Sequence, residues 1–163
     1  MSASTREPWM VARSSVEFVE EGAFLAPRFD RDGLIPVVTT DALSGEVLML
    51  GVMNAEALLR TIETREAHYW SRSRGALWRK GATSGLVQKI VEMRIDDDQD
   101  AIWLRVRVEG LGASCHVGYR SCFSRSVEMG LPIQAPVALT FVEREKVFDP
   151  REIYGDAPNP TKL

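Results

Sequence analysis

Short apolar runs separated by turn residues recur along most of the chain, and this pattern predicts a protein rich in β-strands. Residues 34–39 and 47–53 are apolar or β-branched runs on either side of the turn residues 41–45, which indicates a β-hairpin. We expect the second of these strands to be fully buried, because its residues are apolar throughout. Two further segments, 86–95 and 101–108, alternate between apolar and polar residues and are predicted to be strands.

Helical signals are fewer. Asn54 is a good N-cap, and Leu58 and Ile62 follow it at helical spacing, so a helix is predicted to begin there. A shorter helix is expected over 14–21, with Ser15 as its cap. Since strands outnumber helices in a chain of 163 residues, the fold class that we expect is α+β, as a strand-rich single domain with one clear helix.

The remaining segments are shorter or less regular. Short strands are predicted at 67–70 and 137–142, and a short strand or turn at 121–125. Residues 71–85 combine glycines, cations and hydroxyl side chains, which is typical of a functional loop, and 110–118 form a second glycine-bearing loop. Prolines near the C-terminus are expected to leave the tail irregular.

Composition excludes several classes of protein. Hydrophobic residues make up 45% of the chain and charged residues 26%, as in an ordinary soluble domain, and the net charge of −3 argues against a nucleic-acid platform or an anionic membrane as partner. The longest apolar run, 47–53, is too short to span a bilayer, which takes about 20 residues. No apolar stretch precedes Arg13 as in a signal peptide, and two cysteines do not make a secreted disulfide framework, so the expected location is cytoplasmic.

Three segments carry residue types that point to chemistry, and the first is acidic. Asp96, Asp98 and Asp100 end a predicted strand at alternate positions, so their side chains are expected to point the same way and converge. Crowded carboxylates repel one another unless a cation lies among them, and hard oxygen ligands suit Mg²⁺, Mn²⁺ or Ca²⁺. The alternative is a solvated acidic turn, which is common in proteins.

The second segment, 112–123, places Cys115, His116 and Cys122 on a glycine-rich loop. Thiolate and imidazole groups bind Zn²⁺, but the spacing is not that of a zinc finger, and two thiolates need further ligands from elsewhere to close a tetrahedral site. The alternatives are two inert core thiols with a surface histidine, or a single disulfide.

The third segment, 69–85, carries arginines, a lysine, hydroxyls and glycines. Together they suit a cradle for phosphate groups, because guanidinium groups and bare backbone N–H groups both bind anions. The two tryptophans of the segment are expected to stack on a base. The alternatives are a basic surface loop beside core tryptophans, or an RNA-binding patch, against which the net charge argues. The candidate binding residues are Trp70, Ser71, Arg72, Ser73, Arg74, Trp78, Arg79, Lys80, Thr83 and Ser84.

Taken together, the three segments resemble the phosphoribosyl-AMP cyclohydrolase family. The similarity covers about residues 33–125, in long motifs that stand in order. The motifs are Asp41…Ser44-Gly45-Glu46-Val47-Leu48-Met49-Leu50…Met53-Asn54…Ala57-Leu58, His68-Tyr69-Trp70-Ser71-Arg72-Ser73-Arg74, Leu77-Trp78-Arg79-Lys80-Gly81, Thr83-Ser84-Gly85, Val87-Gln88 and Cys115-His116…Gly118-Tyr119-Arg120-Ser121-Cys122-Phe123.

The resemblance implies a specific activity and assembly. The family hydrolyses the adenine ring of 1-(5-phosphoribosyl)-AMP in histidine biosynthesis, where water adds to the purine C6 and the N1–C6 bond opens. It also implies a cytoplasmic, intertwined homodimer that binds Zn²⁺, needs Mg²⁺ and shares its active sites between subunits. The family's three aspartates fall on Asp96, Asp98 and Asp100, as Mg²⁺ ligands, and its two downstream cysteines fall on Cys115 and Cys122, as zinc ligands.

One position departs from the family pattern. Where the family has a third zinc-ligand cysteine, between the first two aspartates, this chain has Asp97. A carboxylate can bind Zn²⁺, but its oxygen is harder than a thiolate, so the site is expected to bind zinc less tightly and to accept Fe²⁺, Mn²⁺ or Co²⁺ better. An open fourth position still suits a metal-activated water, and His116 is expected to be the acid–base residue or a further ligand.

We expect three parts in the chain: an N-terminal arm over 1–32, a cyclohydrolase core over 33–125 and a C-terminal extension over 126–163. The extension is too short for the helical pyrophosphohydrolase domain that many family members carry, so a single activity is expected. Two other functions stay open: a divergent paralogue with relaxed zinc dependence or a different purine nucleotide substrate, and a catalytically inactive nucleotide-binding protein. The expected partners are a small-molecule nucleotide and a second copy of the chain, with no nucleic acid and no membrane.

Overall fold

The computed structural model describes residues 8–130, 132 and 136–163, so the first seven residues of the expected N-terminal arm lie outside it. The described residues form one strand-rich domain, which confirms the expected α+β class. The strands are β1 (Ile35–Asp41), β2 (Val47–Met53), β3 (His68–Ser71), β4 (Ala76–Arg79), β5 (Gln88–Ile95), β6 (Ile102–Val108), β7 (Arg125–Val127) and β8 (Leu139–Phe141). The helices are α1 (Val16–Glu21), α2 (Ala55–Thr64) and α3 (Pro150–Tyr154).

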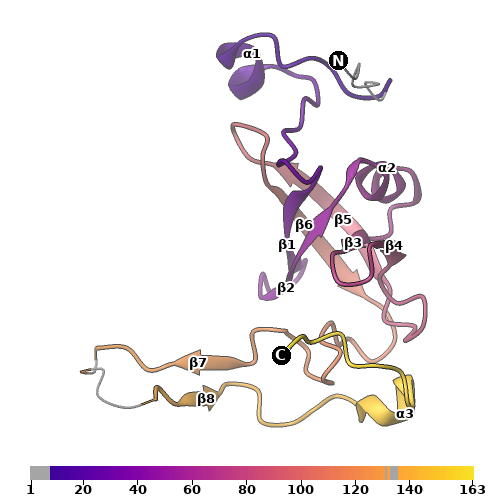
Figure 1. Cartoon of the computed structure of the whole chain (residues 1–163), viewed down its shortest axis with the longest axis vertical. Helices are drawn as coiled ribbons and strands as arrows, with labels where there is room; N and C mark the ends of the chain where they lie inside the picture. Colours follow the sequence, from indigo (N-terminus) through magenta and orange to yellow (C-terminus); the bar gives the residue numbers. More distant parts are fainter. Residues whose placement is uncertain (1–7, 131, 133–135) are drawn as a thin grey trace.

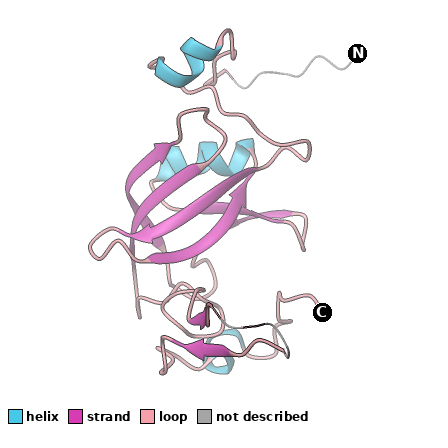
Figure 2. Cartoon of the chain, turned by 90° about the vertical axis from the view of Figure 1, so that its left-hand side faces the viewer, coloured by secondary structure: helices cyan, strands magenta, loops and turns pink. Residues whose placement is uncertain are grey.

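Four strands form the central sheet, in the order β2-β1-β6-β5 (Figure 1). β1 pairs antiparallel with β2 and β5 pairs antiparallel with β6, whereas β1 and β6 run parallel. Helix α2 covers one face of this sheet (Figure 2), and β3 packs against both α2 and β2. The core lies between these elements and includes Ile35, Val37, Leu48, Met53, Leu58, Tyr69, Leu104 and Val106.

The boundaries of these elements follow local chemistry. β2 covers the predicted segment 47–53, and the Asp41 carboxylate closes the hairpin turn by accepting hydrogen bonds from two backbone N–H groups. Asn54 caps α2 and Ser15 caps α1, each by accepting a backbone N–H of the first helical turn. The two alternating segments are strands β5 and β6, as predicted.

Three sequence predictions are wrong in part. β2 is an edge strand and is not fully buried, since Val47 and Leu50 are 39% and 62% exposed. Residues 71–85 are not one loop, because 76–79 form β4 and pair with β3. The tail is not irregular throughout, because Pro150 stands in the first turn of α3, where its missing N–H costs no helical hydrogen bond.

The C-terminal extension lies at the end of the molecule away from α1, and its β7–β8 arm projects sideways from the body (Figure 1). A two-stranded hairpin is marginally stable by itself, and contiguous exposed apolar side chains mark contact surfaces. The arm therefore has the character of an interaction surface. Its exposed apolar residues are Val127, Met129, Val137, Leu139, Phe141 and Val142.

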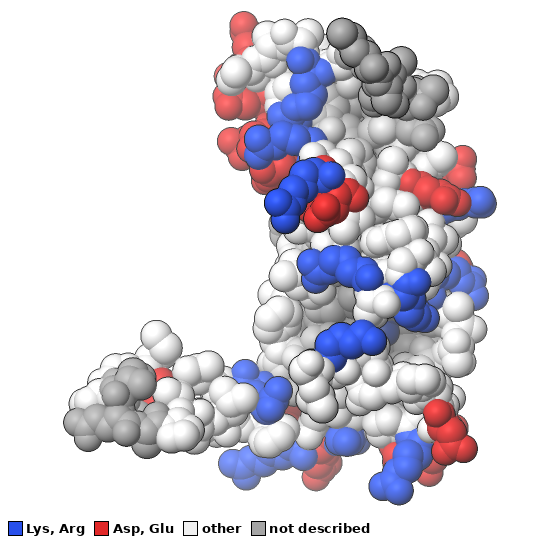
Figure 3. All heavy atoms as spheres, viewed as in Figure 1, with Lys and Arg blue, Asp and Glu red and all other residues white. Residues whose placement is uncertain are grey.

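The charged surface is mixed rather than of one sign. On the face drawn in Figure 3, acidic and basic side chains lie together at both ends, and the middle carries mainly basic groups. The described part of the chain contains no helix that is long and apolar enough to cross a membrane.

Candidate active site

The two groups of predicted metal ligands lie at opposite ends of β6. The acidic turn 96–100 joins β5 to β6, and the loop with Cys115 and Cys122 follows the other end of β6 (Figure 1). β6 has seven residues. Because a strand rises roughly 3.3 Å per residue, its two ends lie on the order of 20 Å apart. A single chain therefore does not bring both groups to one ion.

The acidic segment is a turn, and this corrects the alternation that the sequence suggested. Asp96 accepts two backbone N–H groups of the turn at 2.9 and 3.0 Å, and Gln99 has a left-handed φ of 56°. Side chains do not alternate through such a turn, and ligand oxygens of Asp96, Asp97 and Asp98 lie within 4.8 Å of one another. Carboxylates this close can bind one hard cation. Asp97 is one of the three whose oxygens lie together.

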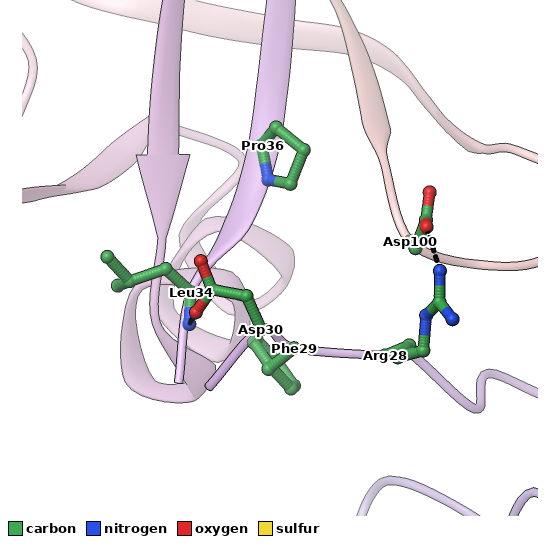
Figure 4. Close-up of a pocket in the computed structure, with 6 residues that line it drawn as sticks. All are labelled: Arg28, Phe29, Asp30, Leu34, Pro36 and Asp100. Carbon is green, nitrogen blue, oxygen red and sulfur yellow. Dashed lines mark hydrogen bonds and ion pairs between the residues drawn. The ribbon is translucent and has the colours of Figure 1, made fainter. Parts of the chain in front are cut away.

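Arg28 of the N-terminal arm is the counter-ion of this turn. Its guanidinium pairs with the carboxylates of Asp98, at 3.4 Å, and Asp100. The Arg28 guanidinium holds the pKa of Asp100 below its usual range, whereas desolvation and the neighbouring carboxylates raise the pKa of Asp98. A cation at the turn would share these carboxylates with Arg28. The hollow beside the pair is lined by Arg28, Phe29, Asp30, Leu34, Pro36 and Asp100 (Figure 4).

Backbone hydrogen bonds give the cysteine loop a fixed shape. The Cys115 N–H donates to the Tyr119 carbonyl at 3.2 Å, so the loop folds back on itself. The Cys122 N–H donates to the Leu48 carbonyl at 2.7 Å, which ties the end of the loop to β2. β2 thereby determines where the second cysteine lies.

This shape brings the two sulfur atoms together. The neighbouring Cys122 thiol lowers the pKa of Cys115 to about 6, and the Cys115 sulfur in turn raises the pKa of Cys122 above its ordinary value. Both are free thiols, and Cys115 is buried whereas Cys122 is exposed. Two sulfur atoms that meet beside solvent fit a soft ion such as Zn²⁺, provided that other groups complete its coordination.

His116 offers a free nitrogen at the same loop. Its Nε2 is buried and has no hydrogen-bond partner within the described residues. Buried polar atoms are rarely left without a partner, and an orphaned one calls for a ligand, a water or a catalytic role. The Nε2 of His116 is thus free to accept a ligand or a proton, but among the described residues His116 does not form a group of three close candidate metal ligands with Cys115 and Cys122.

A series of buried polar groups leads from the core to the cysteine loop. The Tyr69 hydroxyl donates to Gln88 Oε1 at 2.7 Å, and the Gln88 amide donates to the Ser114 hydroxyl at 3.1 Å. The Lys80 ammonium donates to the Ser114 carbonyl at 2.7 Å. Ser114, which precedes Cys115, is thus held through both its hydroxyl and its carbonyl.

Lys80 differs from the other predicted phosphate-binding residues because its side chain is buried. It is 5% exposed, and its burial lowers the pKa of the amine. Its ammonium also lies 5.7 Å from the centre of the Trp78 ring. The structure thus places the Lys80 ammonium against the loop that carries Cys115, rather than among the exposed cations of the β3–β4 hairpin.

The other candidate binding residues lie on and beside the β3–β4 hairpin. Arg72 is exposed on its turn, and the Arg74 guanidinium lies 5.7 Å from the centre of the Trp78 ring. Arg79 is already engaged, because it pairs with Glu66 at 2.8 Å. The exposed or partly exposed members of the set are Trp70, Ser71, Arg72, Ser73, Arg74, Trp78, Arg79, Thr83 and Ser84.

Three residues shape the site through contacts that no sequence pattern predicts. Arg28 bonds to Asp98 across 70 positions of the chain, and Gln88 bonds to Ser114 across 26. Glu143 accepts a hydrogen bond from a backbone N–H 23 positions earlier. No periodicity or local motif links residues so far apart, so only the fold reveals these contacts.

Comparisons with known proteins identify the same family that the sequence motifs resemble. Residues 49–124 match the model of a family described as phosphoribosyl-AMP cyclohydrolase. Curated proteins of that name from Rhodopseudomonas palustris (strain BisA53) and Nitrobacter hamburgensis are both 55% identical to this chain, over 83% and 86% of its length and 90% and 93% of theirs. One from Bradyrhizobium diazoefficiens is 54% identical over 83% of this chain and 94% of its own. The chain belongs to the phosphoribosyl-AMP cyclohydrolase family.

Proposed function

We propose that this protein is a phosphoribosyl-AMP cyclohydrolase of histidine biosynthesis. Its reaction would add water to C6 of the adenine ring of 1-(5-phosphoribosyl)-AMP and break the N1–C6 bond. The observation that carries the proposal is that one loop, folded back on itself and tied to β2, holds the Cys115 and Cys122 thiols as neighbours and also carries the buried Nε2 of His116, which has no partner within the described residues. These groups stand within the stretch that matches the family model, 49–124.

The residues present fit two kinds of cation. Cys115 and Cys122 would hold Zn²⁺, or Fe²⁺ or Mn²⁺ in its place, because their sulfur atoms already meet. The carboxylates of the acidic turn would hold Mg²⁺: the family pattern implies Asp96, Asp98 and Asp100 as ligands, whereas the ligand oxygens that lie close together are those of Asp96, Asp97 and Asp98. Zinc, when bound, supplies Lewis-acid activation of a water molecule.

The chain's own side chains would bind the nucleotide and move the proton. The buried Nε2 of His116 would accept a proton from the attacking water and return it to N1 as the ring opens. Trp70 and Trp78, which are partly exposed on the hairpin, would stack on the base. Arg72 and Arg74 would bind the phosphates through their guanidinium groups.

The site is proposed to be shared between the subunits of an intertwined homodimer. Within one chain the acidic turn and the cysteine loop stand at opposite ends of β6, so a site that uses both needs a second copy. The exposed apolar side chains of the β7–β8 arm supply surface that such a copy would cover. A cytoplasmic location, and the absence of nucleic-acid and membrane partners, stay predictions.

The test is a turnover assay on the full chain, stripped of metal and then reconstituted with Zn²⁺, Fe²⁺ or Mn²⁺ in the presence of Mg²⁺. We expect ring opening of phosphoribosyl-AMP to return with at least one of these ions and to stay absent from the stripped protein. Tight nucleotide binding without turnover under every condition would instead favour the catalytically inactive binding protein. Turnover of another purine nucleotide alone would favour the divergent paralogue.

Removing an exposed cation of the hairpin should weaken substrate binding. Arg72→Ala is expected to raise KM roughly 10-fold or more, because a charge-assisted hydrogen bond contributes about 1.5–3 kcal/mol. Arg79→Ala should also raise KM and in addition lower stability, since Glu66 loses its partner. Steady-state kinetics and urea unfolding measure both effects, with Arg151→Ala on α3 as the control. Unchanged KM in both hairpin variants would exclude this hairpin as the phosphate site.

Replacing the aspartate that departs from the family pattern should tighten zinc binding. Asp97→Cys is expected to raise zinc affinity and to lower activity with Fe²⁺ or Mn²⁺ relative to the parent, because a thiolate is the softer donor. A competitive chelator titration of both proteins with each metal measures the change. Equal zinc affinity in the two proteins would mean that position 97 does not ligate.

A further inference from the structure

The C-terminal extension crosses the cysteine loop and bonds to it at two places. The Glu143 carboxylate accepts the N–H of Arg120 at 2.8 Å with one oxygen, and the N–H of Ser121 at 2.9 Å with the other. Farther along the extension, the Val147 N–H donates to the Gly118 carbonyl at 2.7 Å. The extension therefore contacts the stretch that leads directly into the second cysteine.

β2 holds the same stretch from the other side. The Ser121 hydroxyl donates to the Val47 carbonyl at 2.7 Å, and the Cys122 N–H donates to the Leu48 carbonyl at 2.7 Å. Two successive N–H groups, of Arg120 and Ser121, thus donate to Glu143, and the next, of Cys122, donates to β2. Without the Glu143 carboxylate, the two neighbouring N–H groups of Arg120 and Ser121 would lose their acceptors, and the backbone directly before Cys122 would be less firmly held.

The extension is itself anchored where it passes the loop. Phe148 is buried against Leu86 and Ala113 and meets the ring of Tyr154 edge-on, at 6.2 Å between centres. Its backbone passes so close to the loop that a Cβ at Gly118 would lie 2.3 Å from the Phe148 carbonyl oxygen. Glu143 therefore belongs to a segment of chain that packs against the loop, and not to a free tail.

We infer that Glu143 is a positioning residue that fixes the backbone of residues 120–122, and with it the Cys122 sulfur, for metal binding. The inference rests on the proposed function only in taking Cys115 and Cys122 as metal ligands. Removing a group that hydrogen-bonds to a metal ligand, and so orients it, commonly lowers metal affinity by about 10–100-fold. The C-terminal extension thereby becomes part of the metal site, although it contributes no ligand.

The experiment compares the parent with Glu143→Gln, Glu143→Asp and the neighbouring control Glu145→Gln, whose side chain is exposed. Amide hydrogen exchange at Arg120 and Ser121 is measured in the metal-free full chain, and zinc affinity is measured by chelator competition. We expect both Glu143 variants to exchange faster at these amides and to bind zinc about 10-fold or more weakly. Glu143→Asp keeps the charge and shortens the reach, so it separates positioning from simple attraction of the cation.

The exchange rates and zinc affinities of these variants decide whether Glu143 positions the loop. Faster exchange with weaker zinc binding in both Glu143 variants, and parent behaviour in Glu145→Gln, would support the inference. Parent zinc affinity in Glu143→Asp would overturn it, because charge alone would then suffice. Unchanged affinity in both variants would also overturn it. If Cys115→Ser binds zinc as tightly as the parent, the proposed cysteine site itself fails, and this result is distinct from the others.

Discussion

Mixing two inactive variants, Asp98→Asn and Cys115→Ser, is expected to restore activity to about a quarter of the parent level. In the proposed homodimer each variant alone would be inactive, because it would lack one half of both of the proposed shared sites. In an equal mixture about half of the dimers carry one subunit of each kind. Such a dimer has one site with both defects and one intact site, so a quarter of all sites would work. The measurement is phosphoribosyl-AMP turnover after subunit exchange, with mass spectrometry to confirm mixed dimers.

The chain supplies a matched control for this experiment. A mixture of Cys115→Ser with Cys122→Ser should stay inactive, because both defects lie on the same loop and no combination of subunits yields an intact site. Mixed dimers of Asp98→Asn and Cys115→Ser without recovered turnover would contradict a site shared between subunits.

Loss of the buried Gln88 side chain should lower the free energy of unfolding by about 2–4 kcal/mol, from the lost hydrogen bonds and the groups left unpaired. Gln88 is fully buried and links the Tyr69 hydroxyl to the Ser114 hydroxyl. Gln88→Leu keeps most of the volume but leaves the Ser114 hydroxyl without this partner. A change of that size is a large part of the roughly 5–15 kcal/mol that stabilises a domain. Urea unfolding of the metal-free parent and variant measures it.

A double-mutant cycle shows whether this effect reaches the cysteine loop. Gln88→Leu, Ser114→Ala and the double variant should be non-additive by about 0.5 kcal/mol or more, because the two side chains share one hydrogen bond. Zinc affinity should fall in Ser114→Ala as well, since Ser114 precedes Cys115. Additive unfolding energies would mean that the core and the loop are not coupled through Gln88.

Most elements could be predicted from the sequence, because their causes are local. The turn at Asp41, the cap at Asn54 and the apolar run of β2 each act within a few residues, and the structure has them where the pattern places them. β4 was missed because its four residues stand inside a segment rich in glycine and cations. Whether Leu50 is exposed depends on the order of strands in the sheet, which no single strand encodes.

The kinds of residue that stand in the candidate site, and the family of the chain, can be recognised without any structure. The acidic group, the two cysteines and the basic hairpin are recognisable from their chemistry and spacing, since these are properties of short segments. Which of these groups come together depends on how the chain folds. The tertiary structure brings Cys115 against Cys122 and buries Lys80 beneath their loop, but leaves the acidic turn at the far end of β6. Such contacts join residues that are distant in sequence, so they follow from the sheet order and the packing of the extension rather than from any local pattern.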